Sequence, residues 1–366
     1  MTCMFADYKF GAGRYFQEKG ALSAAGMEAA RHGGRAYIIG GPRAMSAVGE
    51  KIIKSFRASG VEHETEIYPG YPTEDKIKEL AVKLKDRRAD VIVGVGGGRV
   101  IDAAKAAAGE AGISVITVPT TAATCAAYTP VSPCYFQDGR FDKTLWHENE
   151  VAAVIADTDV IAAAPERYIV SGMLDAMAKY VEMANGGIPG FAATPADRHG
   201  ACHLAKYIFD TLEECAEQAV RDAHARIHTK LLDDVCFINI ALTGMVSGMT
   251  RGKGQTAAAH AFYNGVRRLF CKEARSFLHG EIVAVGLLSQ CAYNSDMKLA
   301  AKLRGFMRRL GVPTSLAELG VAETDENLSA LFDFMKTARF MQAPGADEEL
   351  LRESLELTRG ERSAQL

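Results

Sequence analysis

Hydrophobic positions in the first third of the chain form two alternating patterns. A glycine-containing aromatic segment predicts a first strand at residues 10–16, and short runs with β-branched residues predict strands at 35–39, 64–68, 91–95 and 113–118. Between them, apolar residues spaced three or four apart predict helices at residues 21–30, 45–56, 73–85 and 100–108. Strands that alternate with helices of this length are typical of βαβ units, so the pattern predicts a parallel sheet.

The pattern changes after Pro119, where residues 120–129 are small and polar. Two short strands at 131–136 and 140–145 are predicted to pair as a hairpin, and residues 151–155 form the last predicted strand. Beyond Pro165 we find almost no strand pattern. Helices are predicted at residues 169–184, 196–215, 218–230, 235–249, 256–266, 281–293, 299–310, 324–338 and 347–357.

The chain therefore divides into two predicted domains. Residues 1–162 form an α/β domain with a parallel sheet, residues 163–366 form an all-helical domain, and the boundary falls near residues 159–165. An α/β half joined to a helical half favours a ligand site between them.

A glycine-rich turn, Gly94-Val95-Gly96-Gly97-Gly98, joins a buried strand to an Ala-rich helix. Glycine lets backbone N–H groups approach a diphosphate, and the positive end of the helix dipole adds to the attraction. Gly96, Gly97 and Gly98 are therefore expected to bind a dinucleotide phosphate. The spacing differs from the common G-x-G-x-x-G fingerprint, so a tight turn without a ligand stays an alternative.

Composition excludes several classes of partner. With 366 residues and a formal net charge of −3, the chain offers no electrostatic case for nucleic acid or an anionic membrane. Residues 1–20 lack an apolar core segment, so we expect a cytoplasmic protein. Its eight cysteines show no C-x-x-C pair, which predicts reduced thiols. A small molecule is the expected partner, and homo-oligomer formation stays open.

Three residues of the helical half could bind a metal: Asp175, His260 and His279. Two imidazoles and one carboxylate suit zinc or ferrous iron and leave a coordination position for substrate. Nothing local forces these residues together, because nineteen positions separate the two histidines. Two core histidines and a solvated Asp are the alternative.

Several motifs together resemble the glycerol dehydrogenase branch of the metal-dependent, iron-containing alcohol dehydrogenases. They occur in the family's order, at residues 96–102, 118–120, 172–176, 257–265 and 277–281. The resemblance implies a dehydroquinate synthase-like fold, in which an α/β domain binds a nicotinamide dinucleotide and a helical domain binds metal and substrate. It implies zinc, with iron as the alternative, held by the catalytic residues Asp175, His260 and His279.

The resemblance also assigns cofactor contacts. The glycine turn holds the diphosphate, and Asp102 faces the nicotinamide end. The other implied contacts are Arg99, Thr120, Thr129, Val131 and Tyr135. A hairpin core is the alternative interpretation for the last four.

The chain departs from the glycerol enzymes at two positions. Cys125 stands where they usually have an Asp, so a carboxylate beside the substrate is lost and an anion is better tolerated. The surrounding residues 121–130 are very similar to hydroxycarboxylate dehydrogenases, which reduce short 2-oxo acids. Cys125 is expected to line the pocket rather than to act as a nucleophile. Tyr263 stands where relatives often have a second His, and it either acts as a poorer base or shapes the pocket.

The end of the second predicted strand bears on the choice of cofactor. An acidic residue there would bind the adenosine ribose and repel a 2′-phosphate. The chain instead reads Gly40-Gly41-Pro42-Arg43, with no carboxylate before Glu50. Arg43 is therefore expected to pair with the 2′-phosphate of NADP(H), which favours NADP(H) over NAD(H), and Gly41 is expected to be a further cofactor contact. A solvated Arg43 at a helix start is the alternative.

We expect hydride transfer between NADP(H) or NAD(H) and a small alcohol or carbonyl, with reduction of a 2-oxo acid to a 2-hydroxy acid favoured. A glycerol or other polyol dehydrogenase is an alternative. A dehydroquinate synthase-like lyase would need a Lys and Arg cluster that we do not locate in the sequence. A non-catalytic cofactor-binding protein is the third alternative.

Overall fold

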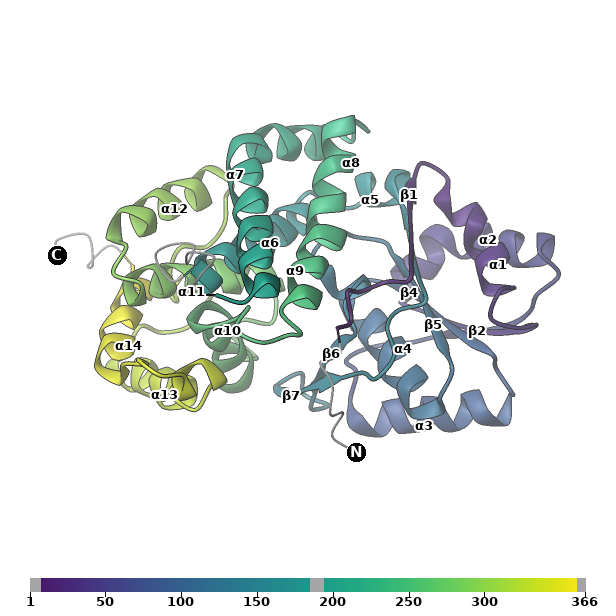
Figure 1. Cartoon of the computed structure of the whole chain (residues 1–366), viewed down its shortest axis with the longest axis horizontal. Helices are drawn as coiled ribbons and strands as arrows, with labels where there is room; N and C mark the ends of the chain where they lie inside the picture. The colour runs from purple at the N-terminus through teal and green to yellow at the C-terminus, as the bar shows by residue number, and fades with distance from the viewer. Residues whose placement is uncertain (1–7, 185–193, 361–366) are drawn as a thin grey trace.

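The computed structural model describes residues 8–184 and 194–360. Its sheet-containing part and its helical part lie side by side, with the sheet to the right in Figure 1. Six parallel strands form the sheet in the order β1-β8-β5-β4-β2-β3. These strands are β1 (Arg14–Glu18), β2 (Arg35–Gly40), β3 (Glu62–Ile67), β4 (Val91–Gly96), β5 (Ser114–Pro119) and β8 (Ala153–Asp157). The prediction of a parallel sheet is confirmed, although the first strand begins four residues later than expected.

Helices cover both faces of this sheet. One face carries α1 (Ala25–Ala29) and α2 (Pro42–Ala58), and the other carries α3 (Glu74–Asp86) and α4 (Gly98–Ala111). Because successive side chains of a strand point to opposite faces, Ile38 belongs to the cluster under α2 while Ile39 belongs to the cluster under α4. Burial on both faces explains why β4 is a continuous apolar run.

The connections of β2 and β4 diverge. Strand β2 leads through α2 to β3 on one side, whereas β4 leads through α4 to β5 on the other side and across the opposite face. β2 and β4 are nevertheless neighbours in the sheet. Open α/β sheets bind ligands at such a topological switch point, beside the carboxyl ends of the two strands. Gly41 and the glycine turn lie there.

The predicted hairpin is confirmed. Strands β6 (Val131–Tyr135) and β7 (Phe141–Trp146) pair antiparallel, with an irregular register between Cys134 and Tyr135.

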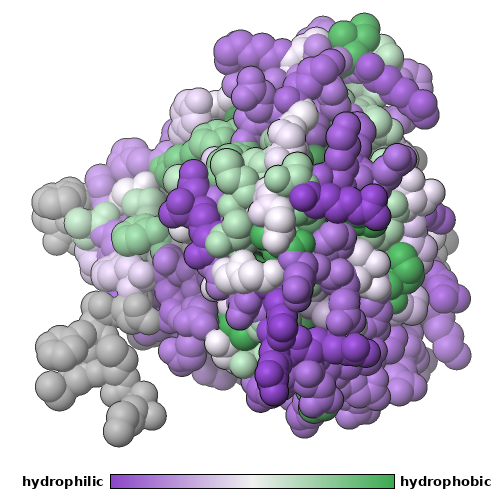
Figure 2. Space-filling model, turned by 90° about the vertical axis from the view of Figure 1, so that its right-hand side faces the viewer, coloured by the Kyte–Doolittle hydropathy of each residue, from purple (hydrophilic) through white to green (hydrophobic). Residues whose placement is uncertain are grey.

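On the face seen in Figure 2, hydrophilic residues surround smaller groups of hydrophobic ones, as on an ordinary globular surface.

The described residues after β8 form helices and turns without a further strand. The helices are α5 (Thr158–Ala162), α6 (Arg167–Ala184), α7 (Ala196–Ala225), α8 (Lys230–Phe237), α9 (Thr243–Met249), α10 (Ala258–Leu269), α11 (His279–Tyr293), α12 (Met297–Arg309), α13 (Asp325–Met335) and α14 (Glu348–Ser354). Short 3₁₀ turns lie at Ala21–Ala24, Cys125–Ala127, Arg339–Gln342 and Leu355–Thr358. Helix α11 is almost entirely buried and packs against α6, α10, α12 and α14.

Two helix predictions in this part are wrong in detail. The predicted pair at 196–215 and 218–230 is one helix, α7, because no Gly or Pro lies between Cys215 and Arg226, where the chain adopts a left-handed conformation and the helix ends. The predicted helix at 235–249 starts earlier, at Lys230, and contains a π-helical turn at Ile238–Leu242. Within the described residues, the stretch Lys230–Met249 is long and apolar enough to cross a membrane, but 67% of it is buried inside the protein, as in a core helix.

Candidate active site

Asp175, His260 and His279 come together although they lie on three different helices. Asp175 is buried on α6, His260 lies on α10, and His279 is the first residue of α11. One potential ligand atom from each lies within 4.8 Å of the others. Asp175 Oδ1 is 3.2 Å from His260 Nε2 and 3.3 Å from His279 Nε2. The three predicted metal ligands therefore form one group, which we call the metal triad.

Glycines of α11 allow its close approach to the neighbouring helices. A Cβ at Gly280 would lie 1.8 Å from the backbone oxygen of Ser171 on α6. A Cβ at Gly286 would lie 2.7 Å from the backbone oxygen of Ala259 on α10. Since any side chain would push the helices apart, these glycines help to place the triad.

A buried carboxylate orients His260. Glu182 Oε2 accepts a hydrogen bond from His260 Nδ1 at 2.6 Å, and its Oε1 accepts from the backbone N–H groups of Ala257 and His260. The Nε2 atom is thereby directed at Asp175. Carboxylates behind histidine ligands are usual in metal sites. Glu182 was missed from the sequence, where its only signal is a position seven residues after Asp175, on the same helix face.

The triad fits a zinc or iron ion. Burial raises the pKa of Asp175, but the two imidazoles outweigh this effect and hold the pKa well below its usual range. Asp175 is therefore ionised, as a metal ligand must be, and Glu182 fixes the tautomer of His260 in a way that leaves Nε2 free for a metal. Three donors of this kind leave a position for substrate.

The expected phosphate site lies at the start of α4. Gly97 caps this helix without a side-chain hydrogen bond, and its first turn carries no acidic residue. Gly96 has φ +149°, which favours glycine. A Cβ at Gly97 or Gly98 would meet nothing closer than 3.8 Å, so the space above the helix start is open. The turn fits a diphosphate.

The start of α2, like that of α4, follows a glycine and has no acidic residue in its first turn. Gly41 caps the helix without a side-chain hydrogen bond, and Pro42 occupies the first position. Arg43 is exposed in the first turn, which has no acidic residue. Among the described residues, no carboxylate forms an ion pair with Arg43.

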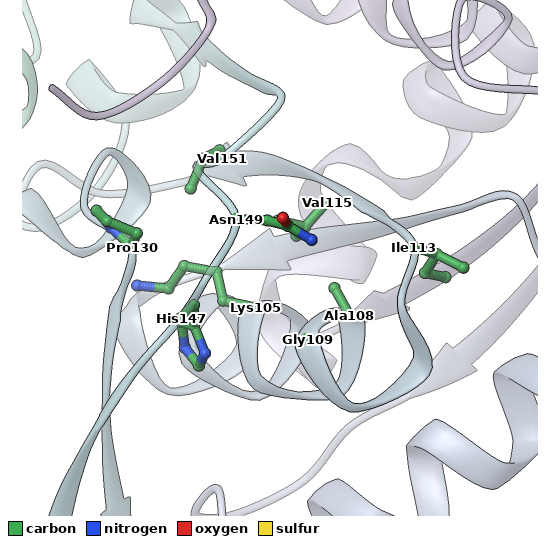
Figure 3. Close-up of a pocket in the computed structure, with 9 residues that line it drawn as sticks. All are labelled: Lys105, Ala108, Gly109, Ile113, Val115, Pro130, His147, Asn149 and Val151. Atoms are coloured by element: carbon green, nitrogen blue, oxygen red, sulfur yellow. The ribbon is translucent and has the colours of Figure 1, made fainter. Parts of the chain in front are cut away.

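Asp102 lies one turn inside α4 and is buried. Burial raises its pKa to about 6, although Lys105 opposes the shift from 3.0 Å away. Lys105 is itself 2% exposed. Its ammonium donates to the backbone oxygens of Ala126 at 2.7 Å, Thr129 at 3.0 Å and Val131. Figure 3 shows Lys105 extending from α4 toward the chain segment of Pro130.

Lys105 therefore ties the segment 126–131 to the helix that follows the glycine turn. This role was missed from the sequence, because its acceptors are backbone atoms. Thr129 and Val131, two of the predicted cofactor contacts, lie on this segment. Thr120 is also close to the turn, since its backbone N–H donates to the oxygen of Gly96.

Aromatic residues connect the hairpin with the metal triad. The hydroxyls of Tyr135 on β6 and Tyr263 on α10 are 3.2 Å apart. The Tyr263 ring lies 4.1 Å from the His279 ring, centroid to centroid. Arg99, next to the glycine turn, stacks on Tyr71. The predicted residues Tyr135 and Tyr263 thus join the cofactor side to the metal side.

Cys125 opens a short 3₁₀ turn between the two sides. Burial, followed by the charge of Asp175, raises its pKa to about 11, and Lys179 and Lys105 act in the opposite direction. A thiol with this pKa is protonated near neutrality, which favours pocket lining over nucleophilic catalysis.

Comparisons with known proteins agree with this architecture. The family profile of iron-containing alcohol dehydrogenases matches residues 12–158. Hydroxycarboxylate dehydrogenase A of Escherichia coli (strain K12) is 36% identical over 82% of this chain and 80% of its own length. Glycerol dehydrogenase of Thermotoga maritima is 33% identical over 86% of each. The crystal structure of a probable glycerol dehydrogenase from Sinorhizobium meliloti 1021 superimposes with a TM-score of 0.84, at 24% identity, and covers 95% of this chain and 97% of that one.

Proposed function

The chain belongs to the family of iron-containing alcohol dehydrogenases, and from this premise we propose that it transfers a hydride between NADP(H) or NAD(H) and a small 2-oxo or 2-hydroxy acid. The observation that carries the proposal is the convergence of Asp175, His260 and His279 beside residues that reach the cofactor side. This arrangement supports an enzyme over a cofactor-binding protein without catalysis.

The overall reaction is balanced by the cofactor and one proton. In reduction, the carbonyl carbon gains a hydride, the carbonyl oxygen gains a proton, and the reduced nicotinamide becomes oxidised. When bound, the metal supplies Lewis acidity toward the carbonyl oxygen, and the nicotinamide supplies the hydride.

Residues of the chain hold and orient the reacting groups. Asp175, His260 and His279 provide the metal ligands, and Glu182 keeps the Nδ1 proton of His260 in place. We assign to the Tyr263 hydroxyl, which contacts the Tyr135 hydroxyl, a hydrogen bond to the reacting group. Burial raises the pKa of Tyr263, so this phenol stays protonated and acts as a hydrogen-bonding group rather than a base.

The substrate class is supported by Cys125. A neutral thiol replaces the carboxylate that glycerol dehydrogenases usually carry, so the pocket has less negative charge to repel an organic acid. The relative from Escherichia coli is named for hydroxycarboxylates. Polyol oxidation is the second candidate, because other relatives are named glycerol dehydrogenases.

A substrate panel tests the proposal. Zinc-loaded and iron-loaded protein should be mixed with reduced or oxidised cofactor, and the absorbance of the reduced nicotinamide followed. Pyruvate should be reduced with a higher kcat/KM than hydroxyacetone, and lactate oxidised in preference to glycerol. Turnover of glycerol but not of lactate would overturn the assignment to organic acids.

A further inference from the structure

Helix α6 carries three charged residues on one buried face. Asp175, Lys179 and Glu182 stand four and then three positions apart, within an otherwise largely apolar helix. All three are at most 5% exposed. Residues at this spacing are neighbours on a helix, so Lys179 lies between the two carboxylates along the face that bears the metal triad.

The two carboxylates have partners, but Lys179 does not. Asp175 contacts both imidazoles, and Glu182 accepts three hydrogen bonds. No described residue lies within hydrogen-bond or ion-pair distance of the Lys179 ammonium, in contrast to the fully bonded Lys105. Lys179 is only 4% exposed, yet its Nζ is not fully enclosed by protein atoms. The ammonium is therefore free to pair with a ligand.

The positive charge of Lys179 affects the pKa values of four groups in the candidate site. It lowers the pKa values of Asp175, Glu182, His260 and Cys125. These groups come from α6, from α10 and from the turn that contains Cys125. Together with its position one helical turn after Asp175, this places the ammonium near the metal triad and Cys125.

The charges at this place favour an anionic ligand. Asp175 and Glu182 contribute two negative charges, which a divalent metal balances, and Lys179 then leaves one net positive charge. A neutral polyol would leave this charge uncompensated. A monocarboxylate would neutralise it and would supply the missing acceptor for the ammonium.

We propose that Lys179 binds the carboxylate of the substrate and so sets the preference for 2-oxo and 2-hydroxy acids over neutral carbonyls and alcohols. The inference rests on the proposed function, whose metal triad fixes where the reacting oxygen lies. A carboxylate on the adjacent carbon would then reach the ammonium while its carbonyl stays at the triad. Lys179 is thus a specificity-determining residue, distinct from the metal ligands.

A matched pair of substrates tests this role. Pyruvate and hydroxyacetone differ only in carrying a carboxylate or a hydroxymethyl group beside the same carbonyl. In Lys179→Met, the ratio of kcat/KM for pyruvate over hydroxyacetone should fall about 10- to 100-fold, mostly through KM for pyruvate. Lys179→Arg should retain a large part of the ratio. Lys206→Met, at a surface lysine paired with Asp210, should leave the ratio unchanged.

Calorimetry of the metal-loaded protein provides a readout that does not depend on turnover. Lactate should bind the unsubstituted protein at least tenfold more tightly than lactamide, and Lys179→Met should remove this difference. The comparison of the two ligands on the unsubstituted protein stays informative even if the variant does not fold.

Failure of the role of Lys179 can be distinguished from failure of the proposed reaction. Equal binding of lactate and lactamide, or an unchanged substrate ratio in Lys179→Met, would overturn the role of Lys179 while pyruvate reduction could still stand. Lactate binding that depends on Lys179, without turnover of any organic acid, would support the carboxylate site and overturn the proposed reaction.

Discussion

We propose that a single residue at the start of α2, Arg43, decides which cofactor phosphate the protein prefers. Arg43 lies in the first turn of α2, where no acidic residue would repel a 2′-phosphate. We expect kcat/KM to favour NADPH over NADH by about tenfold or more, because a charge-assisted contact is worth roughly 1.5 to 3 kcal/mol. Arg43→Ala should abolish this preference, measured as the ratio of kcat/KM for the two cofactors. Preference for NADH, or an unchanged ratio in the variant, would refute the assignment.

The ionised Asp102 carboxylate is expected to lower the free energy of unfolding at neutral pH. Burial raises its pKa from 3.8 to about 6, so the folded protein favours the protonated carboxyl, and stability falls as pH rises from about 4 through 6. Asp102→Asn should therefore increase the free energy of unfolding by up to about 3 kcal/mol at pH 8 and by much less at pH 4. Urea denaturation at both pH values measures the difference.

A matched control separates burial from the loss of a charge alone. Asp86→Asn replaces an exposed carboxylate at the end of α3 and should change the free energy of unfolding by less than about 0.5 kcal/mol at either pH. A less stable Asp102→Asn protein at pH 8 would contradict the explanation.

At the scale of elements, the close contact of α11 with α6 is the feature most sensitive to substitution. Gly280→Ala would place a Cβ 1.8 Å from the backbone oxygen of Ser171. We expect a loss of about 1–3 kcal/mol of stability and a weaker metal affinity, since His279 begins the same helix. Metal titration and denaturation measure the two effects.

Gly305→Ala is the control, because its Cβ would meet only Arg309, at 3.7 Å. This substitution in α12 should leave metal affinity unchanged and raise stability by up to about 1 kcal/mol. Equal behaviour of the two variants would show that the contact at Ser171 does not position His279.

Strands and helices are predicted best where the hydrophobic residues follow a single regular spacing along the sequence. Strand β4 was recognisable because burial on both faces requires a continuous apolar run. The division of α7 into two helices was wrong, because the structure shows one continuous helix that buries Leu212, Ala216 and Ala219. The π-helical turn before α9 adds one residue to a turn, which periodicity does not register.

The candidate site was only partly accessible from the sequence. The metal triad was selected through a family resemblance, and the structure brings its members together. Glu182 and Lys105 were missed because their partners, on α10 and on the segment 126–131, lie far away along the chain. Such partners become visible only when the helices are packed.

For the molecule as a whole, the site depends on contacts between the sheet-containing part and the helical part. The hydroxyls of Tyr135 and Tyr263 meet across this junction, and Asn239 donates to the backbone oxygen of Ala122 at 3.0 Å. The first part contains the glycine turn expected to hold the cofactor, and the second contains the metal triad. Hydride transfer is therefore expected only when both parts are loaded.

The most direct test is pyruvate-dependent oxidation of NADPH in protein that has been freed of metal and then titrated with zinc or ferrous iron. We expect no turnover without metal, recovery at one metal ion per chain, and loss of both metal and activity in His260→Ala. The cofactor should still bind to this variant, since the glycine turn is unchanged. Full activity in a verified metal-free preparation, or in His260→Ala, would contradict the account.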